Sequence, residues 1–124
     1  MFPFQNKKHK KGLRKLAKLT EHSKKRLKER CGFSRGTSSR MAEKALKYGI
    51  SHKETTGELN RWLSGQYLKY KKGNNIRLYG DMAYIFQGTM LLTVLYIPKN
   101  LLTKAHALEK RKKVMLQEEI RKSE

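Results

Sequence analysis

The sequence has one cysteine and no long apolar run. Cys31 alone cannot form an intrachain disulfide or a multi-cysteine zinc motif, and a single cysteine is typical of a protein from a reducing compartment. No stretch approaches the roughly 18–20 apolar residues that a membrane-spanning helix needs, and no apolar run of signal-peptide length precedes the first lysines. We therefore expect a soluble, cytoplasmic protein with no membrane partner.

Recognisable sites for metals and cofactors are also missing. The histidines are widely spaced, with no other histidine, cysteine or acidic residue in ligand register; they are His9, His22, His52 and His106. The glycines at 32 and 36 follow neither the phosphate-loop nor the dinucleotide-binding spacing. The sequence thus predicts no metal ion and no cofactor.

Acidic residues are scarce relative to basic ones. Ten Asp and Glu stand against thirty Lys and Arg in 124 residues, which gives a formal net charge of +20 on a chain about one domain long. Half of this excess lies in residues 1–30, which hold twelve basic residues and two Glu. Because a basic surface gains affinity for phosphates by releasing counterions, the distribution indicates a polyanionic partner. The alternative is a solvated, charged helix face.

The apolar pattern divides the chain into three parts. Residues 1–12 show no helical spacing and are expected to form a flexible basic tail. Residues 13–100 are expected to form a single α+β domain, and residues 101–124 a C-terminal charged helix.

Within the domain, a helical spacing of apolar residues changes to the alternation of strands near residue 74. The pattern predicts two or three N-terminal helices packed on a small antiparallel β-meander, with one face of the sheet on the helices and the other free. Alternation places Arg77 and Tyr79 on the same face. The first expected helical segment covers about 13–31 and stops at Gly32, either as one helix or as two helices divided near Thr20 or Ser23. The second expected helix covers 39–48, and Thr55 or Thr56 caps a third. The expected strands cover 76–79, 82–86 and 90–97.

One set of residues suits RNA cleavage without a metal. His22, Arg26 and Arg30 recur at four-residue steps, so one helix face carries an imidazole and two guanidiniums. Arg77 and Tyr79 of the sheet complete the predicted catalytic set. Such cleavage needs a proton donor and acceptor near neutral pH, together with fixed cations that stabilise charge on the phosphate. The alternative is a surface histidine beside arginines that simply contact phosphates.

Aromatic residues lie among the basic ones, a combination typical of proteins that hold single-stranded nucleic acid by stacking and phosphate contacts. RNA or single-stranded DNA fits this pattern better than a duplex. The tyrosines are also compatible with ordinary strand and core positions. The residues predicted to bind nucleic acid are Lys15, Lys18, Lys24, Lys25, Lys28, Arg61, Lys71, Lys72 and Tyr84.

Three segments carry a resemblance to known families. They are HSKKRLKERCG at 22–32, NIRLYG at 75–80 and AYIF at 83–86. Through them the chain resembles small uncharacterised basic proteins of Gram-positive mobile elements. The order of a histidine-arginine helix, further helices and an antiparallel meander is also similar, over about residues 20–100, to the RelE and BrnT toxins, which are small metal-independent ribonucleases.

The toxin resemblance implies a fold in which the histidine and arginines of the helix, with the arginine and tyrosine of a strand, line an RNA-facing sheet. Because such toxins usually act with an antitoxin, the resemblance also implies a cognate protein partner, which we expect to be acidic. The matching positions are His22, Arg26, Arg30, Arg77 and Tyr79.

Three functional hypotheses follow. The first is an RNA-binding, RelE-like ribonuclease with His22 as acid and base. The second is a non-catalytic protein of a phage or plasmid that binds RNA or inhibits a host ribonucleoprotein such as a CRISPR effector. The third is a DNA-binding regulator that uses a helix pair within residues 20–50.

Overall fold

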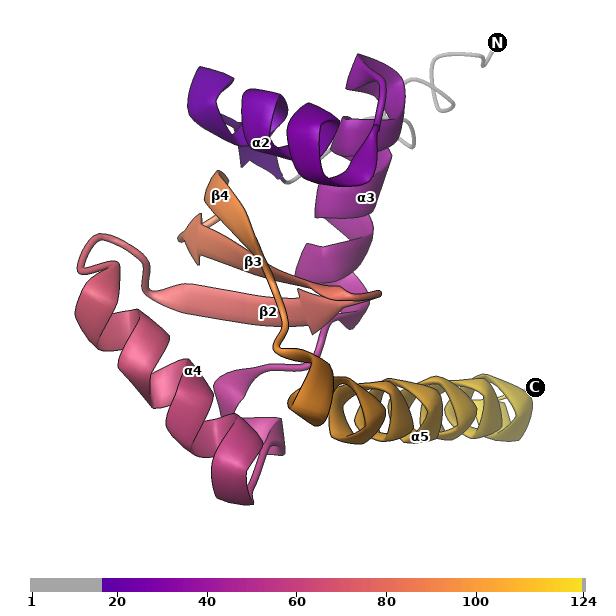
Figure 1. Cartoon of the computed structure of the whole chain (residues 1–124). Coiled ribbons are helices and arrows are strands. Elements are labelled where there is room, and N and C mark those ends of the chain that lie inside the picture. Colours follow the sequence, from indigo (N-terminus) through magenta and orange to yellow (C-terminus); the bar gives the residue numbers. More distant parts are fainter. Residues whose placement is uncertain (1–16, 124) are drawn as a thin grey trace, which may run out of the picture.

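The computed structural model describes residues 17–123, so the predicted tail at 1–12 lies outside the described residues. The described chain forms helices and one small sheet, which confirms the α+β class (Figure 1). The elements are β1 (Lys18–Leu19), α2 (Glu21–Cys31), α3 (Arg35–Tyr48), the short 3₁₀ helix η1 (His52–Glu54), α4 (Gly57–Lys69), β2 (Asn75–Tyr79), β3 (Met82–Gln87), β4 (Met90–Tyr96) and α5 (Lys99–Ser123).

The predicted antiparallel meander is confirmed. β2 pairs with β3 and β3 with β4, and Gly80 and Gly88 in the turns between them have positive φ angles of 61° and 63°, which favour glycine. A further strand, β1, pairs in parallel with β4, so the strand order is β1-β4-β3-β2. The predicted helix was therefore wrong at Lys18–Leu19, because the backbone there bonds to the edge of β4, with 2.9 Å from the Lys18 nitrogen to the Thr89 oxygen.

Local signals account for most helix ends. Gly32 ends α2 with a left-handed φ of 70°, and Thr56 precedes α4, both as predicted. The next helix, α3, begins at Arg35, four residues earlier than predicted. The reason is that Ser34 takes the N-cap position, where its hydroxyl accepts a hydrogen bond of 3.3 Å from the Thr37 backbone nitrogen.

Helices cover both faces of the sheet. α2 and α3 cover the face that carries Tyr84 and Phe86, and α4 with the first turns of α5 covers the face that carries Ile76 and Ile85 (Figure 1). The prediction of a free face was wrong. Strand β3 is buried at five successive positions, 82–86, and because successive side chains point to opposite faces, both layers are needed to cover them.

The C-terminal helix starts at Lys99, two residues before the predicted boundary. Leu101 and Ala105 in its first turns are buried in the same core as α4. Its second half extends away from the sheet (Figure 1). Three large apolar side chains are exposed there. These are Val114, Met115 and Ile120. Across residues 17–123, no helix is long and apolar enough to cross a membrane.

Candidate nucleic-acid interface

The predicted catalytic residues of α2 lie at the surface of the helix that covers β4. His22 is exposed in the first turn. Arg26, one turn later, forms an ion pair with Glu29, with 2.7 Å between the arginine Nη1 and the glutamate Oε1. An exposed pair of this kind contributes little to stability, so Arg26 can exchange this partner for a phosphate.

The other two predicted arginines bind backbone carbonyls. Arg30 donates from Nη1 to the carbonyl oxygen of Val94 on β4, and its guanidinium lies 5.9 Å from the centre of the Tyr96 ring. Arg77 donates from Nη1 to the carbonyl oxygen of Gly49, at the end of α3, over 3.2 Å. Both guanidiniums therefore hold elements of the fold together in this structure.

The predicted catalytic set is divided between two parts of the sheet. Arg77 and Tyr79 lie on the same face of β2, in agreement with the predicted alternation. Because β3 lies between β2 and β4, Arg77 is about 10 Å in the sheet plane from the strand that α2 covers. Tyr84 of β3 lies between these two strands, in register with Arg77 of β2 on one side and with Val94 of β4 on the other.

The prediction that Tyr84 binds nucleic acid was wrong. Its side chain is 1% exposed and belongs to the core between the sheet and the helices α2 and α3, so its ring offers no surface to a base. Burial raises the pKa of Tyr84 above its ordinary value of 10.0, with smaller contributions from the neighbouring Cys31 and Tyr79.

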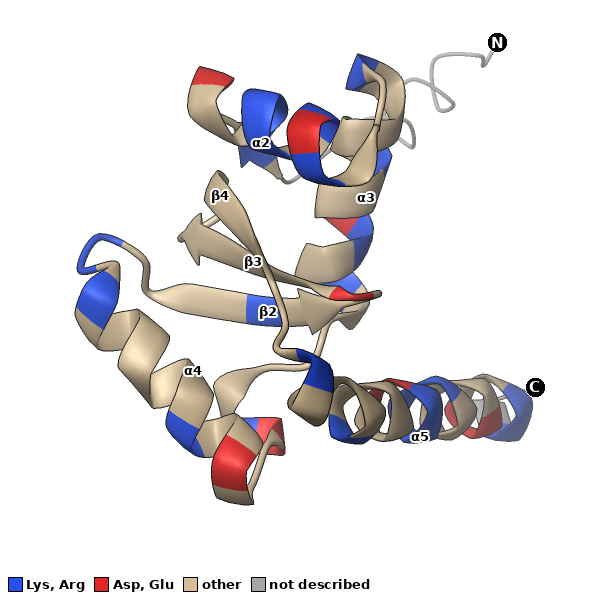
Figure 2. Ribbon diagram, in the orientation of Figure 1, with Lys and Arg blue, Asp and Glu red and all other residues tan. Residues whose placement is uncertain are grey.

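Three of the predicted nucleic-acid-binding lysines meet in one groove between α2 and the start of α3. The groove has a volume of about 370 Å³ and carries four cationic side chains and one carboxylate. The carboxylate, on the first residue of α2, pairs with only one of the lysines, at 3.1 Å. Figure 2 shows several basic residues along α2 at this end of the molecule. The lining residues are Glu21, Lys24, Lys25, Lys28, Phe33, Ser34, Arg35 and Ser38.

Arg35 is the groove cation that the sequence did not single out. The turn at 32–34 places the start of α3 against α2, which brings Arg35 next to lysines that precede it by seven to eleven residues. Arg35 is also the first residue of α3, so the positive end of the helix dipole opens on the groove. The signal available in the sequence was the Gly32 stop followed by the Ser34 cap, which together indicate a second helix that begins directly after the first.

The remaining predicted contacts are scattered. Lys18 is exposed on the edge strand β1, Arg61 is exposed on α4 on the opposite side of the sheet, and Lys71 and Lys72 are exposed in the turn before β2. Lys15 lies outside the described residues. These residues are available for phosphate contacts but do not form one site with the groove.

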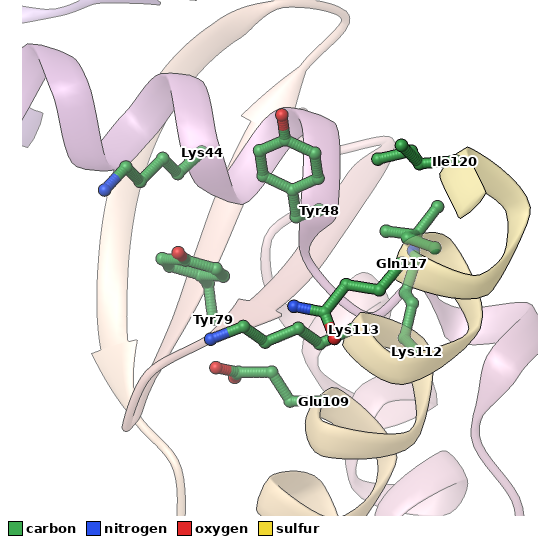
Figure 3. Close-up of a pocket in the computed structure, with 9 residues that line it drawn as sticks. Lys44, Tyr48, Tyr79, Glu109, Lys112, Lys113, Gln117 and Ile120 are labelled. Carbon is green, nitrogen blue, oxygen red and sulfur yellow. The ribbon is translucent and has the colours of Figure 1, made fainter. Parts of the chain in front are cut away.

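A second cleft lies between α3 and α5, with a volume of about 300 Å³ (Figure 3). Two tyrosines line it, Tyr48 from the last turn of α3 and Tyr79 from the end of β2. Lys44 and Lys113 lie at its margin. Sequence patterns did not indicate this cleft, because α3 and α5 are separated by some fifty residues that form α4 and the sheet.

Neither a metal site nor a reactive thiol is indicated among residues 17–123. No group of three or more His, Cys, Asp or Glu side chains there is arranged to hold a metal ion. Burial raises the pKa of the Cys31 thiol, against the opposing effect of Arg30, so the thiol is a poor nucleophile at neutral pH.

Comparison with known proteins adds no family. No protein-family model, curated protein or solved structure matches this chain. The similarity to RelE and BrnT toxins therefore stays a prediction.

Proposed function

We propose that this protein binds single-stranded nucleic acid, and RNA in particular, through the groove between α2 and α3. The proposal is carried by the convergence of Lys24, Lys25, Lys28 and Arg35 around the N-terminus of α3. Lysine and arginine side chains beside a helix N-terminus form a favourable environment for phosphate oxygens. The same contacts suit free RNA and RNA exposed on a ribonucleoprotein.

Binding through this groove is expected to be independent of sequence. Exposed lysines act as point charges toward phosphates and do not read base edges. The affinity then depends on salt, because each neutralised phosphate releases a counterion.

Neutralising three groove cations tests the proposal. We expect Lys25→Gln, Lys28→Gln and Arg35→Gln, combined, to weaken binding of a labelled single-stranded RNA by about a hundredfold at 0.1 M salt. The slope of log affinity against log salt should fall by about 2, since each contact with a single strand contributes about 0.7. Fluorescence anisotropy over a salt series measures both quantities.

The matched control removes the same charge elsewhere. Lys53, Lys99 and Lys104 are exposed outside the groove, so their combined replacement by Gln should leave most of the affinity. Equal losses in the two triple variants would show that net charge alone, and not the groove, is responsible for binding.

We infer that the protein binds RNA without cutting it. The ribonuclease hypothesis needs Arg30 and Arg77 beside His22 on one phosphate, whereas these two guanidiniums are engaged by the carbonyls of Val94 and Gly49. With EDTA present, RNA incubated with the wild-type protein should therefore stay at full length on a denaturing gel. Cleavage by the wild type that His22→Ala abolishes would instead establish the ribonuclease function.

A further inference from the structure

We propose that the cleft between α3 and α5 binds one unstacked nucleobase together with its adjoining phosphate. The inference rests on the proposed function, because it makes the cleft the base-binding subsite of the same single-stranded RNA. It goes beyond that function in assigning a second site, formed by different elements, that selects single strands over duplexes.

The walls of the cleft are aromatic and aliphatic. Tyr48 is 49% exposed and Tyr79 is half-buried, and their rings come from two different elements, α3 and β2. Leu116 and Ile120 of α5 continue the apolar surface, and Ile120 is 62% exposed. Side chains of this size are usually buried, and a flat base that enters the cleft would cover them.

The margin of the cleft carries cations from both sides. Figure 3 shows Lys44 of α3 and Lys113 of α5 beside the tyrosines. Lys112 differs from them, because its Nζ donates to the carbonyl oxygen of Gly49 at 2.9 Å and to Glu54 at 3.0 Å. Lys44 and Lys113 are therefore the cations suited to the phosphate, and Lys112 supports the wall.

Polar groups in the cleft suit a base edge. Gln117 is exposed and its amide offers both a donor and an acceptor (Figure 3). Glu109 already accepts a hydrogen bond of 3.0 Å from the Gly80 backbone nitrogen. Burial, followed by the charge of Glu109 and the nearby Tyr48, raises the pKa of Tyr79, so its hydroxyl stays protonated and can donate.

The sign of the charge favours a nucleotide over an apolar ligand. Lys112 is paired with Glu54, and the other charged side chains of the cleft are two lysines and one carboxylate, so its occupant should carry negative charge. Ring stacking with an adjacent phosphate combines both features in one ligand, and duplex RNA cannot supply it because its bases are paired and stacked.

Replacing the exposed tyrosine tests the site on the full chain. We expect Tyr48→Ala to weaken binding of single-stranded RNA by about 5- to 150-fold, the range that loss of one stacked base produces. Tyr48→Phe, which keeps the ring, should retain the wild-type affinity. Leu68→Ala is the control, since Leu68 is 77% exposed on α4 outside both the cleft and the groove, and it should keep the wild-type affinity.

Direct titration with a mononucleotide separates this inference from the proposed function. Adenosine monophosphate added to isotope-labelled protein should shift backbone amide signals at the end of α3, the end of β2 and the second half of α5, whereas inorganic phosphate should not. If single-stranded RNA does not bind at all, the proposed function fails, and the mononucleotide titration still tests the cleft.

Three results would overturn the base-binding cleft without contradicting the proposed binding of RNA in the groove. They are a Tyr48→Ala variant that binds RNA like the wild type, duplex RNA that competes as strongly as single-stranded RNA, and an acidic peptide that shifts the cleft signals when adenosine monophosphate does not.

Discussion

Gly49→Ala should remove most of the native stability, with a loss above about 4 kcal/mol. Gly49 is buried where α3 ends against β2, and a Cβ there would lie 2.4 Å from the Ala45 carbonyl oxygen and 2.8 Å from the Arg77 Cβ. Neither atom is at the end of a flexible side chain. Because the added Cβ would overlap both the last turn of α3 and β2, the backbone after α3 must shift, which would disturb the hydrogen bonds between Ile50 and Leu78 at 2.8 and 2.9 Å.

Gly65→Ala is the control for this prediction. Gly65 lies in the interior of α4, is exposed, and has no atom within 4 Å of an added Cβ. Because glycine is a poor helix former, alanine there should stabilise the protein by about 1 kcal/mol. Urea denaturation followed by circular dichroism measures both changes. A Gly49→Ala protein within about 1 kcal/mol of the wild type would contradict the packing of α3 against β2.

Tyr84→Ala should destabilise the fold by about 3–5 kcal/mol, as expected for truncation of a large buried aromatic residue. The side chain is 1% exposed and fills the layer between the sheet and α2 with α3. The loss is therefore one of packing, and the same denaturation experiment detects it. Leu68→Ala, at a side chain that is 77% exposed, should change stability by less than about 0.5 kcal/mol.

Tyr84→Phe keeps the ring and should leave both the fold and the RNA affinity at neutral pH intact. It should also change the alkaline limit of stability. Tyr84 has an ordinary pKa of 10.0 when unfolded and a raised pKa when folded, so above pH 10 the folded state binds more protons than the unfolded state. As the pH rises above 10, the free energy of unfolding of the wild type should therefore fall by up to about 1.4 kcal/mol per pH unit more than that of Tyr84→Phe. Equal alkaline profiles for the two proteins would place Tyr84 in solvent.

Much of the fold could be predicted from local pattern. Gly32 ends α2 because glycine alone adopts a left-handed φ of 70° without strain. Strand β2 followed from alternation, and β3 and β4 followed from apolar runs next to the turns at Gly80 and Gly88. These features depend on neighbours within a few residues, so sequence patterns contain them.

The errors share a different cause. The parallel pairing of Lys18–Leu19 with Met90 and Leu91 joins segments about seventy residues apart, and no local propensity indicates it. The second helical layer, which buries Ile76 and Ile85, depends on α4 and α5 closing on the sheet from distant positions. Tyr84 fits the pattern of aromatic residues among basic ones, but strand alternation identifies only its face and not the helices that cover that face.

For the groove and the cleft, too, some features follow from the sequence and others only from the packing of the chain. The sequence by itself determined the net charge of +20, the basic character of α2 and the absence of recognisable metal and cofactor motifs. Only the tertiary structure decided which cations act together. The turn between α2 and α3 places Arg35 beside the lysines of α2, and the approach of α5 to α3 places Lys113 in the same cleft as Tyr48. Charge is a sum over residues and can be read from composition, whereas a binding site needs side chains brought within a few ångströms of one another by packing.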